Sequence, residues 1–325
     1  MKAIVCEGFG PIDQLQYKEI KDPIPGKNQV VVDMRACSVN FPDTLIVQGK
    51  YQMKPDLPFS PGSDIAGVVS RVGEEVEKWK EGDAVFGFTR VGGFAEKIVV
   101  NQYQIFPKPP EMPFDIAASF LMAYGTSYHA LKDRAILKKG ETVVVLGASG
   151  GVGLAAVELS KMVGAKVIAA ASTEKKLSLC QRYGADEIIN YEEEDLKNRI
   201  KELTDGKGAD IVYDPVGGKY SEPALRAMAP GGRFLVVGFA AGDIPKIPLN
   251  LPLLKICSVV GVFWGRFSNE QPKKSLQNSR ELIEMFQAGK LQPHISQTFS
   301  LKNAVGALQK IQQRTAMGKL VITNL

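Results

Sequence analysis

Apolar and polar positions follow different patterns on the two sides of about residue 120. Before that point, short apolar stretches are separated by Gly, Pro and Asp. In QVVVDMRA, residues 29–36, a period of two is seen, because Val30, Val32, Met34 and Ala36 alternate with Val31, Asp33 and Arg35. Prolines at 55, 58, 61, 107, 109, 110 and 113 interrupt any helix. The pattern predicts an all-β, barrel-like domain of short strands over residues 1–121.

After about residue 122, apolar runs of four to six residues alternate with predicted helices of about ten. The runs begin with TVVVLG at residues 142–147 and continue through KVIAAA, EIINY, DIVYD and GRFLVVGF. Such short apolar runs are typical of buried parallel strands joined by crossover helices. The sequence therefore predicts a doubly wound parallel sheet, and so an α/β protein, with this domain spanning residues 122–265.

The C-terminal part is less regular. Two amphipathic helices are predicted around residues 276–288 and 301–313, followed by a final strand, GKLVIT. We expect this strand to return to the first domain. Residues from about 266 to 325 would then complete that domain.

Composition and charge argue against several classes of function. The net charge is +5, but positive and negative residues are mixed along the chain, which is typical of a solvated surface, so no nucleic-acid partner is expected. The four cysteines and two histidines lack metal-binding spacing, so no metal site is expected. The cysteine usage fits a reducing compartment, the cytoplasm. No apolar run approaches the roughly 18 residues of a membrane span, so no membrane association is expected.

The stretch GASGGVG follows a predicted strand and opens a predicted helix. With Ala148 in the first glycine position, it has the spacing of a dinucleotide-binding turn. Such a turn lets the backbone approach a pyrophosphate, and the N–H groups at the start of the helix point at it. The sequence therefore predicts a dinucleotide bound by Ala148, Ser149, Gly150, Gly151, Val152 and Gly153.

The second strand of this domain ends at Ala171 without the acid that usually binds the ribose of NAD. A hydroxyl at Ser172 and an ammonium at Lys176 suit an additional phosphate, which favours NADPH over NADH. In the alternative interpretation, Ser172 caps the following helix, Glu174 complements its dipole and Lys176 is solvated.

The same letters also match G-x-S-x-G, the nucleophile turn of serine hydrolases. Ser149 would be the nucleophile, Asp214 or Asp243 the acid and His294 the base. This alternative leaves Gly153 unexplained and lacks an upstream oxyanion loop, so the dinucleotide interpretation is preferred.

Over essentially its whole length, the chain resembles the medium-chain dehydrogenase/reductase superfamily. The block PGSDIAGVVSRVGEEVEKWKEGDAVFG is similar to the GroES-like catalytic domain of that superfamily, and GASGGVG is similar to its cofactor turn. The chain looks most like the zinc-free NADPH:quinone oxidoreductase, or zeta-crystallin-like, branch. Where zinc-dependent members carry a cysteine and a His-Glu pair, this chain has Asn40, Ser63 and Asp64, which as a set are poor zinc ligands.

The resemblance also implies roles for individual residues. Asn40 and Tyr51 match the catalytic pair that would hydrogen-bond the acceptor oxygen, with Asp43 and Asp64 holding their loops. Thr126 would lie on the nicotinamide side. The nicotinamide would be bordered by Val237, Gly238, Phe239, Phe263 and Trp264, and the 2′-phosphate would be bound by Lys176, Tyr191 and Arg314.

These residues imply a metal-free, NADPH-dependent reductase of quinones or α,β-unsaturated carbonyl compounds, with a cleft between its two domains. Without a Lewis acid, an electron-poor acceptor needs mainly orientation and one hydrogen bond to be reduced. The alternatives are an acryloyl-CoA or enoyl reductase of the same superfamily and an NADPH-binding sensor or structural protein. Relatives of this kind are usually dimers, so we expect a homodimer, with SVVGVFWG as a candidate edge strand.

Overall fold

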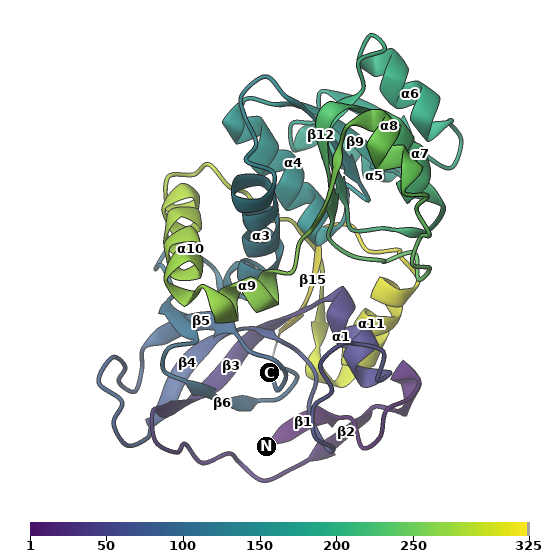
Figure 1. Ribbon diagram of the computed structural model, residues 1–325. Coiled ribbons are helices and arrows are strands. Elements are labelled where there is room, and N and C mark those ends of the chain that lie inside the picture. The colour runs from purple at the N-terminus through teal and green to yellow at the C-terminus, as the bar shows by residue number, and fades with distance from the viewer. Residues whose placement is uncertain (324–325) are drawn as a thin grey trace. The chain divides into compact units, whose positions relative to one another are not determined.

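The computed structural model describes residues 1–323 (Figure 1). The chain divides into two compact units. Unit 1 consists of Met1–Met122 together with the chain from Pro293 onward, and unit 2 is Ala123–Gln292. The sequence-based division gave residues 266–325 to the first domain, whereas the structure places residues 266–292 in unit 2.

Unit 1 is built around a seven-stranded sheet in the order β14-β15-β3-β4-β5-β7, with β6 also paired to β3, beside the two-stranded sheet β1-β2. Its strands are β1 (Lys2–Val5), β2 (Gln16–Glu19), β3 (Gln29–Val39), β4 (Asp64–Val72), β5 (Ala84–Phe88), β6 (Lys97–Asn101), β7 (Ile105–Pro107), β14 (Ile295–Ser300) and β15 (Lys319–Thr323). Its helical segments are η1 (Ile12–Gln14), α1 (Phe41–Val47), α2 (Phe114–Ala117), η4 (Leu301–Asn303) and α11 (Ala304–Gln312).

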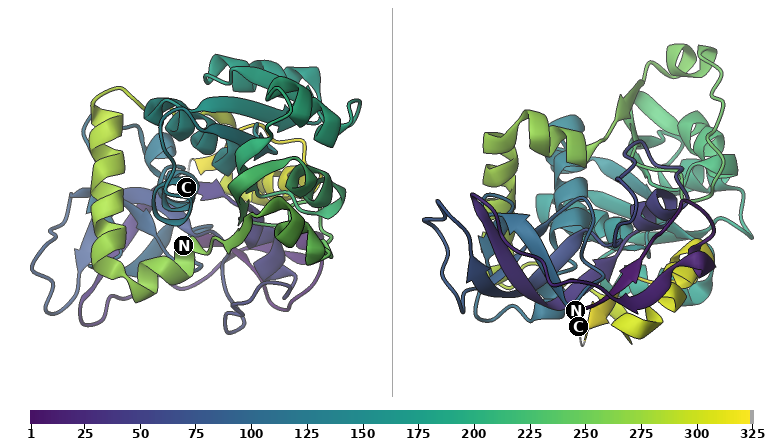
Figure 2. Two further views of the ribbon diagram at one scale, coloured as in Figure 1. Left: turned by 45° about the horizontal axis from the view of Figure 1, so that its top comes forward. Right: turned by 90° about the horizontal axis from the view of Figure 1, so that it is seen from below.

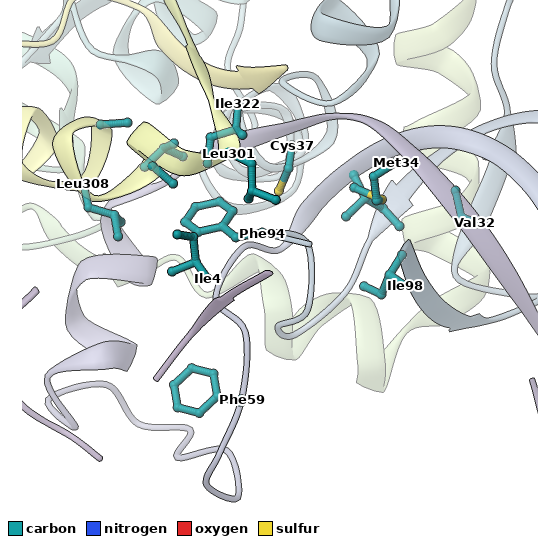
Figure 3. Close-up of a cluster of buried hydrophobic side chains, with 14 of the residues drawn as sticks. Ile4, Val32, Met34, Cys37, Phe59, Phe94, Ile98, Leu301, Leu308 and Ile322 are labelled. Carbon is teal, nitrogen blue, oxygen red and sulfur yellow. The ribbon is translucent and has the colours of Figure 1, made fainter. Parts of the chain in front are cut away.

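The final strand does return to the first part of the chain. β15 pairs antiparallel with β3, with Leu320 opposite Val39, and β14 pairs parallel with β15. One hydrophobic core therefore draws on both ends of the chain. Figure 3 shows part of it, where Ile4, Cys37, Phe94, Leu301, Leu308 and Ile322 gather from β1, β3, a loop, η4, α11 and β15. Burial of each such aliphatic side chain contributes about 1.5–3 kcal/mol.

Unit 2 contains a six-stranded sheet in the order β10-β9-β8-β11-β12-β13, in which all pairings are parallel. Its strands are β8 (Thr142–Leu146), β9 (Lys166–Ala171), β10 (Glu187–Asn190), β11 (Ala209–Asp214), β12 (Met228–Val236) and β13 (Ser258–Gly261). The chain moves outward from β8 to β10 and then restarts on the other side of β8 with β11. This reversal is the switch point at which doubly wound sheets bind ligands.

The helices of unit 2 connect these strands, as Figure 1 shows for α4 and α5. α3 begins at the end of unit 1 and continues into the π-helix η2, and a change of direction separates α9 from α10 (Figure 2). The helical segments are α3 (Leu121–Tyr128), η2 (His129–Arg134), α4 (Gly151–Val163), α5 (Glu174–Arg182), α6 (Leu196–Leu203), η3 (Gly218–Tyr220), α7 (Ser221–Arg226), α8 (Asn250–Lys255), α9 (Trp264–Glu270) and α10 (Pro272–Gln287).

The predicted fold class is confirmed: an N-terminal domain built on antiparallel strands accompanies a doubly wound parallel sheet in an α/β protein. Within residues 1–323, every helix is too short or too polar to cross a lipid bilayer.

Candidate functional site

The predicted cofactor-binding residues of unit 2 lie mostly just after the carboxyl ends of parallel strands. Parallel strands end at the same edge of a sheet, so these segments lie along one edge. They are residues 147–153 after β8, 172–176 after β9, Tyr191 after β10, 237–239 after β12 and 263–264 after β13. The glycine turn, on β8, stands at the switch point of the strand order.

The turn after β8 requires glycine at defined positions. A Cβ on Gly153 would lie 2.4 Å from the carbonyl oxygen of Gly147 and 2.8 Å from backbone atoms of Ala148, so only glycine lets α4 pack this closely. Gly147 itself has a φ of +56°, in the left-handed region. Gly150, in contrast, has room for a Cβ, whose nearest neighbour would be the Gly147 oxygen at 3.4 Å. The protein's own packing therefore does not explain Gly150.

The start of α4 is fixed by a buried hydroxyl pair that the sequence analysis did not identify. Ser127 donates to the carbonyl of Val152 at 2.8 Å, and the Tyr213 hydroxyl lies 2.9 Å from the Ser127 oxygen. Because that serine proton is already used, Tyr213 is the donor of the second bond. Thr126, the predicted nicotinamide neighbour, is half-buried and adjacent to this anchor on α3.

Beyond β9, the structure brings two of the predicted phosphate-binding groups together. The Lys176 ammonium donates to the Ser172 hydroxyl at 2.9 Å. The interpretation in which Ser172 caps α5 is wrong, because the N-cap is Thr173, whose side chain accepts from the backbone N–H of Lys176. Ser172 and Lys176 therefore form a polar pair at the end of the strand where the ribose-binding acid is missing.

Tyr191 follows β10 and lies beside a charged group that the sequence analysis did not anticipate. Its ring is 4.3 Å from the ring of Tyr220, centroid to centroid. The Tyr220 hydroxyl donates to Glu192, and Lys219 pairs with the same carboxylate at 3.0 Å. The Glu192 carboxylate, next to Tyr191 in the chain, is therefore paired with a cation.

A buried aspartate organises the loop after β11. Asp214 accepts hydrogen bonds from the backbone N–H groups of Val216 and Gly217, both at 2.8 Å, and from the Ser221 hydroxyl at 2.6 Å. These bonds occupy the carboxylate within its own loop and disfavour Asp214 as the acid of a hydrolase triad. The backbone N–H groups of Val237 and Gly238 donate to the Asp214 carbonyl, and Phe239 packs against Gly217.

The remaining predicted cofactor residues differ in exposure. Trp264 is buried and packs against Gly125, whose Cβ would lie 2.8 Å from the indole. Phe263, the residue before it, is 49% exposed. Arg314 belongs to unit 1, follows α11, has a φ of +58° and is exposed.

In unit 1, the two predicted catalytic residues flank α1. Asn40 directly follows β3 and is the N-cap of α1, whose first turn contains Asp43. The Asp43 carboxylate accepts from the backbone N–H of Asn40 at 2.8 Å, which fixes the start of the helix. Tyr51 follows α1 and is half-buried against the core of unit 1.

The Asn40 side chain belongs to a buried polar network. Its Nδ2 donates to the Ser38 hydroxyl and to Asp64 Oδ2, each at 3.3 Å, and Ser38 also donates to that carboxylate at 3.1 Å. Its Oδ1 accepts a hydrogen bond from the ammonium of Lys319, at the start of β15. The two acceptors of Nδ2 lie only 3.1 Å apart, so they share one amide hydrogen and leave the second for a ligand, while Oδ1 is taken up by Lys319.

Burial shapes the charges in this network. It raises the pKa of Asp43 to about 7 and also raises the pKa of Asp64, against the opposing effects of Lys319 and of hydrogen bonds. Burial lowers the pKa of Lys319, which the two carboxylates partly offset. Burial and the negative charge of Asp43 raise the pKa of the Tyr51 hydroxyl above its usual value of 10.0, so Tyr51 carries its proton at neutral pH.

The positions where zinc-dependent relatives bind metal do not suit one here. Asn40 offers only a neutral carboxamide oxygen that already accepts from Lys319, and Ser63 offers only a neutral hydroxyl. The Lys319 ammonium lies 3.8 Å from Asp64 Oδ2, and a metal ion would have to share the space around that carboxylate with this cation. Elsewhere in residues 1–323, no group of three or more His, Cys, Asp or Glu side chains is arranged to hold a metal ion.

Fold and motifs together define a two-domain dehydrogenase/reductase. Family models described as "Alcohol dehydrogenase GroES-like domain" and "Zinc-binding dehydrogenase" match residues 26–110 and 151–281. The chain belongs to the medium-chain dehydrogenase/reductase superfamily, in its quinone oxidoreductase branch. It is 41% identical to a "Quinone oxidoreductase-like protein 2 homolog" from Nematostella vectensis, over 99% of this chain and 88% of the relative.

Solved structures agree with this placement. Quinone oxidoreductase from Escherichia coli, crystallised in complex with NADPH, superposes with a TM-score of 0.93 at 28% identity, covering 99% of this chain and 100% of that one. The CurK enoyl reductase superposes with a TM-score of 0.90 at 27% identity, covering 99% and 98%.

Proposed function

We propose that the protein is an NADPH-dependent, zinc-independent reductase that transfers a hydride to quinones or α,β-unsaturated carbonyl compounds. The observation that carries the proposal is the glycine turn at the switch point of the unit 2 sheet, where Gly150 has no packing role and β9 ends without an acid. Relatives and solved structures named as quinone oxidoreductases support it, one of them holding NADPH.

In this proposal, unit 2 holds the cofactor. The backbone of the turn and the first turn of α4 receive the pyrophosphate, for which exposed N–H groups at a helix start are suited. Thr126, Val237, Gly238, Phe239, Phe263 and Trp264 border the nicotinamide, and Ser172, Lys176 and Tyr191 receive the 2′-phosphate. Binding of the same phosphate by Arg314, which belongs to unit 1, stays a prediction. Bound NADPH would supply the hydride.

The residues of unit 1 handle the acceptor oxygen. A quinone or enone that takes up a hydride gains negative charge on oxygen, and one proton completes the reduction. Tyr51 donates that proton, because its raised pKa keeps the hydroxyl protonated, and solvent returns it. Asn40 donates its second amide N–H to the same acceptor oxygen, where negative charge develops.

The test is NADPH oxidation, followed optically, with an ortho-naphthoquinone, a small alkenal and acryloyl-CoA as separate acceptors. We expect turnover with the quinone or the alkenal, and activity that survives a chelator. Replacing Tyr51 by Phe should lower kcat by about 10- to 100-fold while leaving NADPH affinity unchanged. Stoichiometric zinc whose removal abolishes activity would contradict the proposal.

A second candidate is an acryloyl-CoA or enoyl reductase, which the similarity to the CurK enoyl reductase favours. Preference for the thioester over the quinone by at least about tenfold in kcat/KM would select it. Tight NADPH binding without turnover of any acceptor would instead indicate a cofactor-binding sensor or structural protein. Inactivation by a serine-directed covalent probe would revive the hydrolase alternative.

We also propose a homodimer formed through β13. This strand is an edge of the unit 2 sheet, with its outer backbone groups unpaired to any strand described within residues 1–323. The segment around it carries large, exposed apolar side chains, namely Ile244, Leu249, Leu253, Leu254, Ile256, Val259 and Phe263. An apolar surface beside a strand edge is suited to binding a second copy of the chain.

We also propose a reducing location, the cytoplasm, because all four cysteines are free thiols.

A further inference from the structure

The Lys319 side chain is enclosed within unit 1. Lys319 opens β15, which lies between β14 and β3, and its side chain is only 7% exposed. Leu320 pairs with Val39 in the antiparallel register, so the residue before Leu320 meets the residue after Val39, which is Asn40. The backbone of Lys319 is fixed as well, since its N–H donates to the carbonyl of His294 at 2.8 Å. The pairing of β15 with β3 therefore places the ammonium next to the Asn40 side chain.

The nearest contact of this ammonium is an amide, not a carboxylate. Lys319 Nζ donates to Asn40 Oδ1, whereas it lies 3.8 Å from Asp64 Oδ2, beyond hydrogen-bonding distance. A lysine present only to balance charge would be expected to bond the carboxylate directly. The geometry gives its direct hydrogen bond to Asn40.

This arrangement selects one of the two orientations of the carboxamide. The two ends of an asparagine side chain have nearly the same shape, but an ammonium only donates and a carboxylate only accepts. Lys319 therefore holds the oxygen end, and Asp64 holds the nitrogen end at 3.3 Å. Turning the amide over would set N–H groups against an ammonium and an oxygen against a carboxylate.

We propose that Lys319 is a positioning residue for the reduction: its ammonium fixes the orientation of the Asn40 carboxamide that meets the acceptor. The inference rests on the proposed function. Burying an ammonium costs several kcal/mol unless charge and hydrogen bonds compensate it. The groups that face Lys319 are Asp64, Asp43 and the Cys37 thiol, so Asp64 supplies the charge and Asn40 the hydrogen bond.

The competing explanation is that Lys319 only neutralises Asp64. Three variants separate the two. Lys319→Met removes both donor and charge, Lys319→Gln keeps an N–H donor without charge, and Asp64→Asn/Lys319→Met restores charge balance without the donor to Asn40. Activity with a quinone, NADPH affinity and thermal unfolding are measured for each.

For a positioning role, Lys319→Met lowers kcat/KM for the acceptor by about tenfold or more with NADPH affinity unchanged, and Lys319→Gln recovers most of the loss. The double variant recovers thermal stability but not activity. Full recovery of activity in the double variant, with Lys319→Gln as impaired as Lys319→Met, would show a counter-ion and overturn the inference. So would a Lys319→Met variant with wild-type kcat/KM.

A second readout does not depend on turnover. In asparagine-labelled protein, the Asn40 side-chain amide signals, assigned by their loss in Asn40→Asp, should shift or broaden in Lys319→Met and remain close to wild type in Lys319→Gln. Unchanged signals in Lys319→Met would also overturn the inference. If the Met variant does not fold, Lys319→Gln and Asn40→Asp carry the test. Wild-type protein that reduces no acceptor would overturn the proposed function and this inference with it, an outcome distinct from an active Met variant.

Discussion

In the proposed function, Lys176 is the residue at the end of β9 that would distinguish NADPH from NADH. Its ammonium already bonds the Ser172 hydroxyl, so both groups are held where β9 ends without an acid. A phosphate received there would gain a charge-assisted hydrogen bond, whereas an NAD ribose would gain little.

Replacing Lys176 by Ala should therefore weaken NADPH binding by about tenfold or more, because a hydrogen bond to a charged group contributes about 1.5–3 kcal/mol. NADH binding should change by less than about twofold. Calorimetric titration with both nucleotides checks this, and Lys175→Ala, an exposed neighbour on the same helix, is the control. Equal losses for NADPH and NADH would contradict the assignment of Lys176 to the 2′-phosphate.

Asp43 makes the stability of the folded protein depend on pH. Burial raises the pKa of this carboxyl from 3.8 to about 7, so the folded state holds a proton that the unfolded state has released between these values. Stability therefore falls as pH rises through that window and levels off above it. Asp64 acts in the same direction, since its pKa is also raised.

The Asp43→Asn variant should show a smaller fall in unfolding free energy than wild type between about pH 5 and about pH 8. Urea unfolding at the two pH values measures the difference. Asp13→Asn, at an exposed position, should keep the wild-type dependence. An Asp43→Asn protein with the full wild-type pH dependence would show that Asp43 does not titrate in this window.

At the scale of elements, two glycines in the turn between β8 and α4 have different expected roles: Gly153 allows close packing, and Gly150 allows a ligand to approach. Gly153→Ala places a methyl group against the backbone of Gly147 and Ala148, which cannot move aside, and should destabilise unit 2 by about 1–3 kcal/mol. Gly150→Ala meets its nearest atom at 3.4 Å and should fold normally, yet weaken NADPH binding by about tenfold or more, because in the proposed function the backbone of this turn receives the pyrophosphate. Thermal unfolding and nucleotide titration of both variants test the pair. A Gly150→Ala protein that binds NADPH as wild type does would place the pyrophosphate elsewhere.

Periodicity in the sequence was sufficient to predict several helices and strands and the fold class. The strand predicted from QVVVDMRA at residues 29–36 is part of β3, and the helix expected around 276–288 is α10, Pro272–Gln287. α10 begins four residues earlier than predicted because Pro272 occupies the first turn, where its fixed φ is favourable and its missing N–H costs nothing. Periodicity marks the interior of an element better than its ends.

Periodicity could not predict the polar network around Asn40. The resemblance drew attention to Asn40, Asp43 and Asp64, but Lys319 is 279 positions away from Asn40 and meets it only through the pairing of β15 with β3. The local signal is a lysine that directly precedes the three apolar residues of the strand KLVIT. Likewise, the sequence suggests no structural role for Asp214, because the turn that it stabilises involves backbone N–H groups, which leave no mark in a sequence.

At the scale of the whole molecule, the chain passes from one unit to the other twice. Near both points it forms a hydrogen bond to the same residue of α4, Glu158. Tyr124, the second residue of unit 2, donates to Glu158 at 2.5 Å, and the backbone N–H of Gln292, the last residue of unit 2, donates to the same carboxylate at 2.8 Å. Burial raises the pKa of Glu158, which these two bonds partly offset. The helix that begins at the glycine turn thus also binds the chain at both ends of unit 2.

The proposed homodimer can be tested at the whole-molecule scale by a single substitution in the edge strand β13. Val259 is 48% exposed in the middle of this edge strand. A lysine there should prevent two copies from pairing, because it places a charge within an apolar contact and edge lysines block strand addition. Light scattering after gel filtration should give two chains for wild type and one for Val259→Lys. Val163→Lys, a similarly exposed valine at the end of α4, should remain a dimer. A Val259→Lys protein that remains a dimer would place the contact on another surface, and a wild-type monomer would remove the dimer from the proposed function while leaving the reductase chemistry to be judged by turnover.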